Sequence, residues 1–243
     1  MKTLKFSDAN DKLKKLKKKL PSFFRSLGLV VPENPKLVAL HKLSGEDCPY
    51  AKACLSKVVL VNGKRTIQDG PHTEFRCYSA SLEALYPALY NKVVHNTELV
   101  AGCSDADEYR QLIDASIPNT DMVRLHIGGD FKTQYEFDAW LGWAKDNPNK
   151  ILYGYTKSLP FWVKRLKLLD SLPNVVLTAS RGGWRDDLIP KHNLRSVTVV
   201  RTKYQARKLG LPLDNDDSHA AHPGKRDKDF ALLIHGVQPK ATK

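Results

Sequence analysis

A carboxylate that directly follows two glycines is the first candidate for chemistry in this sequence. Asp130 ends the run DMVRLHIGGDF, in which the apolar residues of 122–127 predict a buried strand. In parallel α/β sheets, the carboxyl ends of strands present reactive side chains, and glycines there let another molecule approach the backbone. We therefore expect Gly128, Gly129 and Asp130 to belong to a binding or catalytic site. A tight turn with Asp130 as a helix cap is the structural alternative.

The same order of elements recurs along the rest of the chain. Strands are predicted at residues 122–127, 150–158, 174–180, 196–202 and 230–238, and amphipathic helical segments separate several of them. This alternation indicates parallel β–α–β units, whose strand ends meet at one edge of the sheet. Polar residues at these strand ends are therefore expected to converge. They are Asp130, Thr156, Lys157, Ser180, Arg181, Arg201 and His235.

These residue types suit an anionic or polar heterocyclic substrate, because they combine a carboxylate, cations, hydroxyls and an imidazole. Tyr155 and Trp184 would add surfaces on which bases stack. In the loop RGGWRDD, Asp186 or Asp187 would supply a second carboxylate. Each residue taken alone is explained as well by a solvated strand end or by core packing. The coincidence of five strand ends is what predicts a site.

Three of the four cysteines form a second candidate site. Cys48 and Cys54 lie in CPYAKAC, and Cys77 lies in RCY. Three such thiols suit zinc or an iron–sulfur cluster, although the spacing matches neither a zinc ribbon nor the Cys-x3-Cys-x2-Cys of radical enzymes. Free buried thiols are the alternative. A further polar run, DNDDSHAAHP, is either a divalent-metal loop, an acid–base pair or a plain polar loop; its candidate residues are Asp216, Asp217, His219 and His222.

The charge balance points to a polyanionic partner. Lys and Arg number 39 against 26 Asp and Glu, which gives a formal net charge of +13. Such a surface binds nucleic acid by releasing the counterions of neutralised phosphates. No apolar run is long enough to span a membrane, and the first residues lack the apolar core of a signal peptide. We expect a protein of the cytoplasm, that of the host if a phage encodes it, without a membrane partner.

The predicted fold class is α/β, with a parallel (β/α) barrel or partial barrel as the first choice and an open doubly wound sheet as the second. Residues 1–21 are predicted as a basic helix that Pro21 ends, either an arm on a phosphate backbone or a solvated helix with a narrow apolar contact face. Residues 22–243 are predicted as one domain with a cysteine-bearing insertion. Within it, Asn62-Gly63 predicts a β-hairpin, and helices are expected at 82–94 and 105–115.

Several motifs together resemble those of the phage gene-product-88-like proteins, over about residues 45–239. They are CPYAKAC, RCYSAS, HIGGDF, YGYTKS, TASRGG and FALLIHGVQP. The resemblance implies a fold similar to a TIM barrel or to radical-SAM enzymes. In radical-SAM enzymes a Gly-Gly-Glu strand end holds the methionyl amine, and Gly128-Gly129-Asp130 is similar to it. Cys48, Cys54 and Cys77 would then hold the cluster.

A competing analogy is to the tRNA-guanine transglycosylase superfamily and to phage relatives that insert 7-deazaguanine bases into DNA. In those enzymes an aspartate attacks C1′ and displaces guanine. Asp130 would be one carboxylate of the pair, and Asp186 or Asp187 the other. The zinc site near the C-terminus of that superfamily has no counterpart, because no cysteine follows Cys103.

The first functional hypothesis is therefore a DNA-modifying glycosyltransferase that exchanges guanine for a 7-deazaguanine base through an aspartate nucleophile. The alternatives are an iron–sulfur enzyme acting on nucleic acid and a non-catalytic DNA-binding protein. The sequence does not distinguish DNA from RNA. The residues expected to bind the base or nucleotide are Gly128, Gly129, Tyr155, Lys157, Ser180, Arg181, Trp184, Arg201 and His235.

Overall fold

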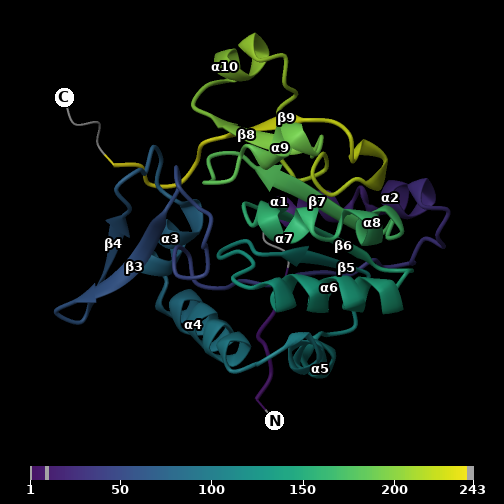
Figure 1. Ribbon diagram of the computed structural model, residues 1–243, viewed down its shortest axis with the longest axis horizontal. Coiled ribbons are helices and arrows are strands. Elements are labelled where there is room, and N and C mark those ends of the chain that lie inside the picture. Colours follow the sequence, from purple (N-terminus) through teal and green to yellow (C-terminus); the bar gives the residue numbers. More distant parts are fainter. Residues whose placement is uncertain (1, 9–10, 240–243) are drawn as a thin grey trace.

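A seven-stranded, mostly parallel sheet forms the centre of the computed structural model, which describes residues 2–8 and 11–239 (Figure 1). The strands lie in the order β1-β2-β5-β6-β7-β8-β9, and only β1 runs antiparallel to its neighbour. Their bounds are β1 Ser7–Asp8, β2 Leu37–Ala39, β5 Met122–Leu125, β6 Ile151–Thr156, β7 Val175–Ser180, β8 Ser196–Val200 and β9 Phe230–Leu233. The predicted α/β class and the parallel strands are confirmed.

The sheet is open, so of the predicted barrel or partial barrel the closed form is wrong, and the partial barrel stays a prediction. The six parallel strands follow one another in chain order, as they would in a barrel, but β1 and β9 are the two edges of the sheet. No pairing joins these edges in the described part of the chain. The strand order also has no reversal of the kind that defines a doubly wound sheet. Among the described residues, no helix is long and apolar enough to cross a membrane.

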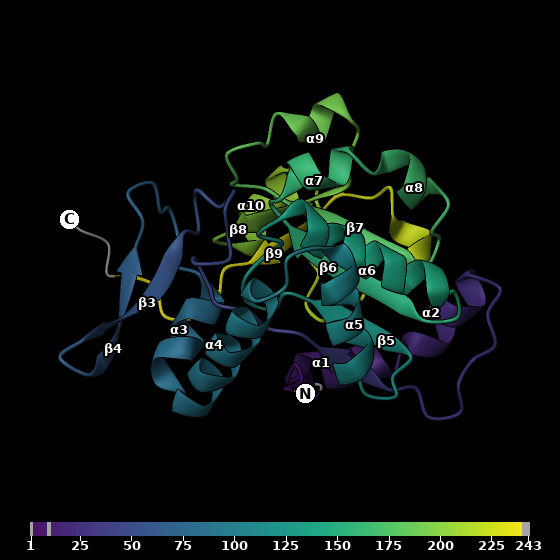
Figure 2. The same ribbon diagram turned by 60° about the horizontal axis from the view of Figure 1, so that its bottom comes forward.

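Most helices cover one face of the sheet, where they bury a large apolar cluster (Figure 2). Trp140 and Trp143 of α6 pack in this cluster against alternate residues of the strands, such as Val123 and Leu125. Such alternation is expected, because successive side chains of a strand point to opposite faces. The helices that follow β2 are α3 Tyr78–Leu85, α4 Pro87–Ala101, α5 Ala106–Ser116, α6 Gln134–Asp146, α7 Leu159–Val163, α8 Leu166–Asp170, α9 Leu188–Lys191 and α10 Lys203–Lys208.

The lysine-rich N-terminal segment covers the opposite face. It forms α1 (Asp11–Lys17) and α2 (Leu20–Ser26), and Leu13, Leu16 and Leu20 are fully buried against Met122 and neighbouring residues of the sheet. The expected narrow contact face thus exists, while residues 1, 9 and 10 of the predicted helix lie outside the described residues. Pro21 does not end a helix but stands in the first turn of α2, where its missing N–H costs nothing. The division into an arm and one domain stays a prediction.

The segment between β2 and β5 carries the three candidate cysteines and a separate two-stranded sheet. The hairpin predicted at Asn62-Gly63 is confirmed as β3 (Ser56–Val61) and β4 (Lys64–Asp69), and it projects beyond the main sheet (Figure 1). The single helix predicted at 82–94 is wrong, because the chain is extended at Tyr86, the residue before Pro87, so that α3 ends at Leu85 and α4 begins at Pro87. The helix predicted at 105–115 is confirmed as α5, which Asp105 caps.

Candidate functional site

Asp130 lies at the carboxyl edge of the sheet and is held there by three hydrogen bonds. Its Oδ1 accepts from Thr156 Oγ1 (2.7 Å) and from the Phe131 N–H (2.8 Å), and its Oδ2 accepts from the Lys157 N–H (2.7 Å). The residue is only 6% exposed. Burial raises the pKa of Asp130, against the hydrogen bonds, which lower it. A nucleophile needs an accessible, ionised oxygen. The arrangement therefore favours a structural role for Asp130, in which its carboxylate joins the ends of β5 and β6.

Lys157 continues this line of contacts to the next strand. Its Nζ donates to Ser180 Oγ (2.5 Å) and to the carbonyl oxygens of Ser180 (3.0 Å) and Arg181 (3.0 Å) at the end of β7. The side chain of Arg181 donates through Nε to Ser196 Oγ (3.1 Å) and lines a cavity of about 540 Å³. The structure therefore brings together the predicted strand ends from Asp130 to Arg181. Their polar groups bind one another.

Protein side chains fill the space beside the two glycines. A Cβ atom on Gly128 would lie 2.1 Å from Ser79 Oγ, and one on Gly129 would lie 2.7 Å from Lys42 Cβ. Gly129 also has a φ of +77°, which favours glycine. These glycines allow the segments before β3 and in α3 to approach the strand end. The close approach expected of another molecule is made here by the chain itself.

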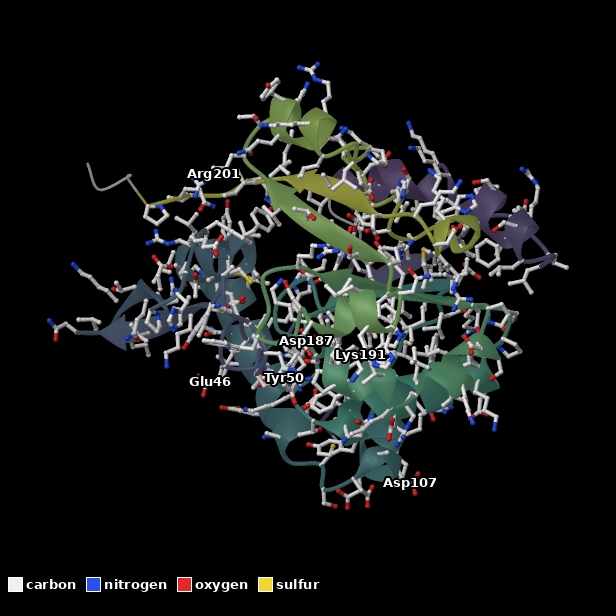
Figure 3. The ribbon with its side chains drawn as sticks, turned by 45° about the horizontal axis from the view of Figure 1, so that its top comes forward. Glu46, Tyr50, Asp107, Asp187, Lys191 and Arg201 are labelled. Atoms are coloured by element: carbon white, nitrogen blue, oxygen red, sulfur yellow. The ribbon has the colours of Figure 1, made fainter. Side chains whose placement is uncertain are left out.

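The loop after β7 holds in place residues 47–78, which carry Cys48, Cys54 and Cys77 and are called the cysteine segment below. Gly182 accepts hydrogen bonds at its carbonyl oxygen from the N–H groups of Lys52 (3.2 Å) and Ala53 (2.9 Å), and the Trp184 N–H donates to the Tyr50 carbonyl (2.9 Å). Figure 3 shows Tyr50 where this loop meets the cysteine segment. A Cβ on Gly182 would lie 2.9 Å from Ala53 Cβ, so this loop requires its glycine.

The two predicted carboxylates of this loop have structural partners. Asp186 accepts from the N–H groups of Gly182 (2.7 Å) and Gly183 (2.9 Å), which stabilises the turn. Asp187 is exposed and pairs with Arg185 Nε at 3.0 Å (Figure 3). Their pairing as catalytic groups with Asp130 stays a prediction, and the hydrogen bonds do not favour it.

The last two strands also contact the cysteine segment. Arg201 follows β8 (Figure 3) and donates through Nη2 to the Glu74 carbonyl at 2.9 Å. His235 follows β9, and its ring lies 4.1 Å from that of Tyr78. Three strand ends, those of β7, β8 and β9, thus fasten residues 50–78 over the carboxyl edge of the sheet. Arg201 and His235 do not join the cluster around Asp130.

The three candidate cysteines are half-buried and close enough to influence one another's charge. Burial, and then the charges of Asp130, Cys77 and Cys54, raise the pKa of Cys48 well above its ordinary value. Burial and the charge of Cys54 raise the pKa of Cys77 to about 11, although the N–H groups of Ser79 and Ala80 at the start of α3 lower it. Among the residues that the structure describes, no three His, Cys, Asp or Glu side chains lie close enough together to bind a single metal ion.

Of the two residues predicted to stack on bases, Trp184 and Tyr155, only Trp184 is exposed. Its ring is half exposed, with the Lys52 ammonium 4.9 Å from its centre and the His72 ring at 5.2 Å. Tyr155 differs, because its hydroxyl donates to Asp217 Oδ1 (3.1 Å) beneath the loop 214–223. Trp184 is therefore placed to stack on a base, and Tyr155 is part of the interior.

The interior face of the sheet holds polar residues that the sequence interpretation missed. Arg124 of β5 forms a buried ion pair with Asp217 (3.1 Å). His126 lies two residues after Arg124, and His41 lies two residues after Ala39, the residue of β2 that pairs with Arg124; both histidines are buried. Both ring nitrogens of His126, and Nδ1 of His41, have no hydrogen-bond partner in the described part of the chain. Burial lowers the pKa of His41 to about 4. The signal was present, because Arg124 and His126 alternate with Val123 and Leu125.

The polar run 214–223 is a folded loop with internal partners. Asp216 pairs with Lys19 of the N-terminal segment (2.8 Å), and His219 stacks on Phe230 at 4.8 Å. His222 stacks on Phe23 at 4.7 Å. These contacts favour the plain polar loop among the alternatives for this run.

Fold and site together define an α/β protein with an open, mostly parallel sheet and a thiol-bearing segment fastened across its carboxyl edge. The chain belongs to the Gene product 88 family, whose model matches residues 3–243. The match confirms the resemblance that the motifs indicate, to a family of phage proteins. It carries no information on the radical-SAM or transglycosylase analogies. No curated protein and no solved structure matches the chain.

Replacing Asp130 with asparagine is expected to lower the free energy of unfolding by about 1–3 kcal/mol. The new amide group would place an N–H against the backbone N–H of Phe131 or Lys157. Urea denaturation measures this loss. Incorporation of labelled guanine into DNA by the same variant tests the base-exchange hypothesis, and undiminished incorporation would remove Asp130 as its nucleophile.

Proposed function

We propose that this protein is an iron–sulfur enzyme that acts on nucleic acid, with Cys48, Cys54 and Cys77 as the cluster ligands. The observation that carries the proposal is the gathering of these three half-buried thiols at the carboxyl edge of a parallel sheet. Thiolates are the usual protein ligands of iron–sulfur clusters. A cluster places several iron and sulfide atoms between its ligands, so the thiols need not meet at one point.

The electrostatics of the thiols favour the binding of a positively charged metal centre. Burial raises the pKa of Cys48 and of Cys77, and negative charge on the neighbouring thiols adds to this effect, from Cys77 and Cys54 for Cys48 and from Cys54 for Cys77. A bound metal centre reverses the balance, because its positive charge allows the thiols to lose their protons together. The N–H groups of Ser79 and Ala80 would further stabilise the Cys77 thiolate.

The surrounding residues would hold the ligands rigidly. The Gly182 carbonyl, Arg201 and His235 each contact the cysteine segment from a different strand end. Reactive sites depend on such support, since small displacements of ligands are costly. A bound cluster supplies one-electron chemistry, and three cysteines, where a full protein shell uses four, leave one position open.

The charge and one exposed ring support nucleic acid as the substrate class. The formal net charge is +13, and Trp184 stands beside the cysteine segment with Lys52 close to its ring. An exposed aromatic ring next to cations suits the stacking of an unpaired base and the neutralisation of its phosphate.

Metal analysis tests the proposal. We expect anaerobically purified or reconstituted protein to contain iron with matching acid-labile sulfide, and the variants Cys48→Ala, Cys54→Ala and Cys77→Ala each to lose most of it. Cys103→Ala is the matched control, because the Cys103 thiol donates to the Leu99 carbonyl (3.5 Å) and packs against the core. Circular dichroism verifies that each variant is folded. Zinc without sulfide, or iron retained by all three variants, would overturn the proposal.

A further inference from the structure

A basic groove lies between α2 and the loop 218–225, which includes the 3-10 helix η1 (Pro223–Lys225). Its volume is about 450 Å³. Four cations line it and no carboxylate does. The cations are Lys18, Lys19, Arg25 and Lys225. A groove with this composition attracts anions, because the cations concentrate positive potential in a concave surface.

The groove is a built feature. Lys19 Nζ donates to Ser218 Oγ (3.1 Å) and pairs with Asp216 (2.8 Å), which joins the N-terminal segment to the loop. The His222 ring packs on the buried Phe23 ring at 4.7 Å and accepts the Gly224 N–H at Nδ1 (3.0 Å). The two walls are therefore held at a defined separation, and the groove exists before any ligand binds.

Most of its positive charge is uncompensated. Of the four lining cations, only Lys19 has a carboxylate within ion-pair distance in the described part of the chain. Burial, and then the positive charge of Lys225, lower the pKa of His222, and the second of these causes is a repulsion within the groove. A phosphate bound between Lys18, Arg25 and Lys225 would relieve this repulsion.

A second hollow extends the groove and shares one residue with it. Lys17, Lys18, Asn34 and Pro35 line this hollow of about 230 Å³. Lys18 thus stands between two adjacent basic hollows, an arrangement that suits consecutive phosphates better than one isolated anion. Helix α2 and the β3–β4 hairpin lie at opposite ends of the molecule in Figures 1 and 2, so this surface is separate from the cysteine site.

We infer that the groove between α2 and residues 218–225, with the hollow beyond Lys18, binds the phosphate backbone of the nucleic acid and anchors it away from the cysteine site. The inference rests on the nucleic-acid part of the proposed function and not on the cluster. Contacts of this kind neutralise phosphates, so they give affinity and salt dependence without reading bases.

Charge reversal tests the inference. The variant Lys18→Glu/Lys225→Glu should bind a labelled single-stranded oligonucleotide at least tenfold more weakly, as measured by fluorescence anisotropy, which is the order expected for two lost phosphate contacts. The slope of log affinity against log salt concentration should also be smaller by about two. The control Lys203→Glu/Lys208→Glu makes the same charge change on exposed residues of α10 and should alter affinity about twofold or less. If the double variant does not fold, Arg25→Glu and Lys203→Glu form the matched pair.

Three outcomes would overturn the inference. They are equal losses in the groove and control variants, displacement of the oligonucleotide by inorganic phosphate at equal phosphate concentration, and tighter binding to vesicles of anionic lipid than to the oligonucleotide. Iron content separates this test from that of the proposed function. The groove variants should keep the iron of the unaltered protein, and the cysteine variants should keep the oligonucleotide affinity.

Discussion

Replacing Lys42 with methionine is expected to lower the free energy of unfolding by about 3–5 kcal/mol. Lys42 is 1% exposed, and its Nζ lies 2.6 Å from Glu136 Oε2, 3.5 Å from Asp47 Oδ2 and 3.2 Å from the Asp130 carbonyl oxygen. Methionine fills a similar volume but leaves the buried Glu136 without its cation and the buried Asp47 with only the partly exposed Lys132. Denaturation in urea, followed by circular dichroism, measures the difference.

Lys132 provides the control for this substitution. Its Nζ lies 3.4 Å from the other oxygen of Asp47, but its side chain is 44% exposed. Exposed ion pairs contribute little, so Lys132→Met should cost less than about 1 kcal/mol. Equal losses in the two variants would show that the buried position of Lys42 has no special weight.

Lys42 also links the core to the candidate cluster site. The Asp130 N–H donates to the Asp47 carbonyl at 2.8 Å, and Asp47 immediately precedes Cys48. Lys42 contacts both aspartates, so its removal would loosen the segment that carries the first cysteine. The Lys42 variant should therefore also bind less iron, while the Lys132 variant keeps it.

The sequence was sufficient for the elements whose pattern is local. The apolar residues from Met122 onward predict a strand that begins there, and Asn62-Gly63 predicts the hairpin, because a short apolar run and a turn pair act within a few residues. The parallel arrangement also followed, since helices between strands leave few other connections. The closure of the sheet did not follow, because it depends on whether distant edges meet.

The N-terminal segment shows a second limit of the sequence. Its lysines suggest a solvated arm, and three of its four leucines, Leu13, Leu16 and Leu20, form only a narrow stripe. That stripe is fully buried, because the face of the sheet on the side of Met122 has apolar residues to cover. Two of the lysines, Lys18 and Lys19, meanwhile line the groove beside the loop 218–225. One short segment thus supplies both core and basic surface. The sequence does not show this, because the loop that forms the other wall of the groove lies about 200 residues further along the chain.

The candidate site was predictable in position but not in the use of its residues. The convergence of Asp130, Lys157 and Ser180 follows from parallel strands, and the structure brings them together. Whether such groups face a ligand or one another depends on side-chain geometry that spacing does not contain. Here they bind one another, and the thiols of the adjoining segment become the better candidates for chemistry.

Replacing Gly129 with alanine is expected to lower the free energy of unfolding by about 2–5 kcal/mol, from left-handed backbone strain and from overpacking. The new Cβ would lie 2.7 Å from Lys42 Cβ and 3.1 Å from the Lys42 carbonyl carbon. Backbone atoms cannot rotate away, so the segment after β2 would have to move. Thermal or urea denaturation measures the loss.

Gly210→Ala separates the two contributions to this loss. Gly210 has a φ of +67°, similar to the +77° of Gly129, but no atom lies within 4 Å of its would-be Cβ. Its replacement should therefore cost only the backbone term of about 1–2 kcal/mol. The excess cost at Gly129 measures how tightly the cysteine segment is packed on the strand end. Equal costs would mean that this segment can withdraw, and that the second glycine leaves room for another molecule after all.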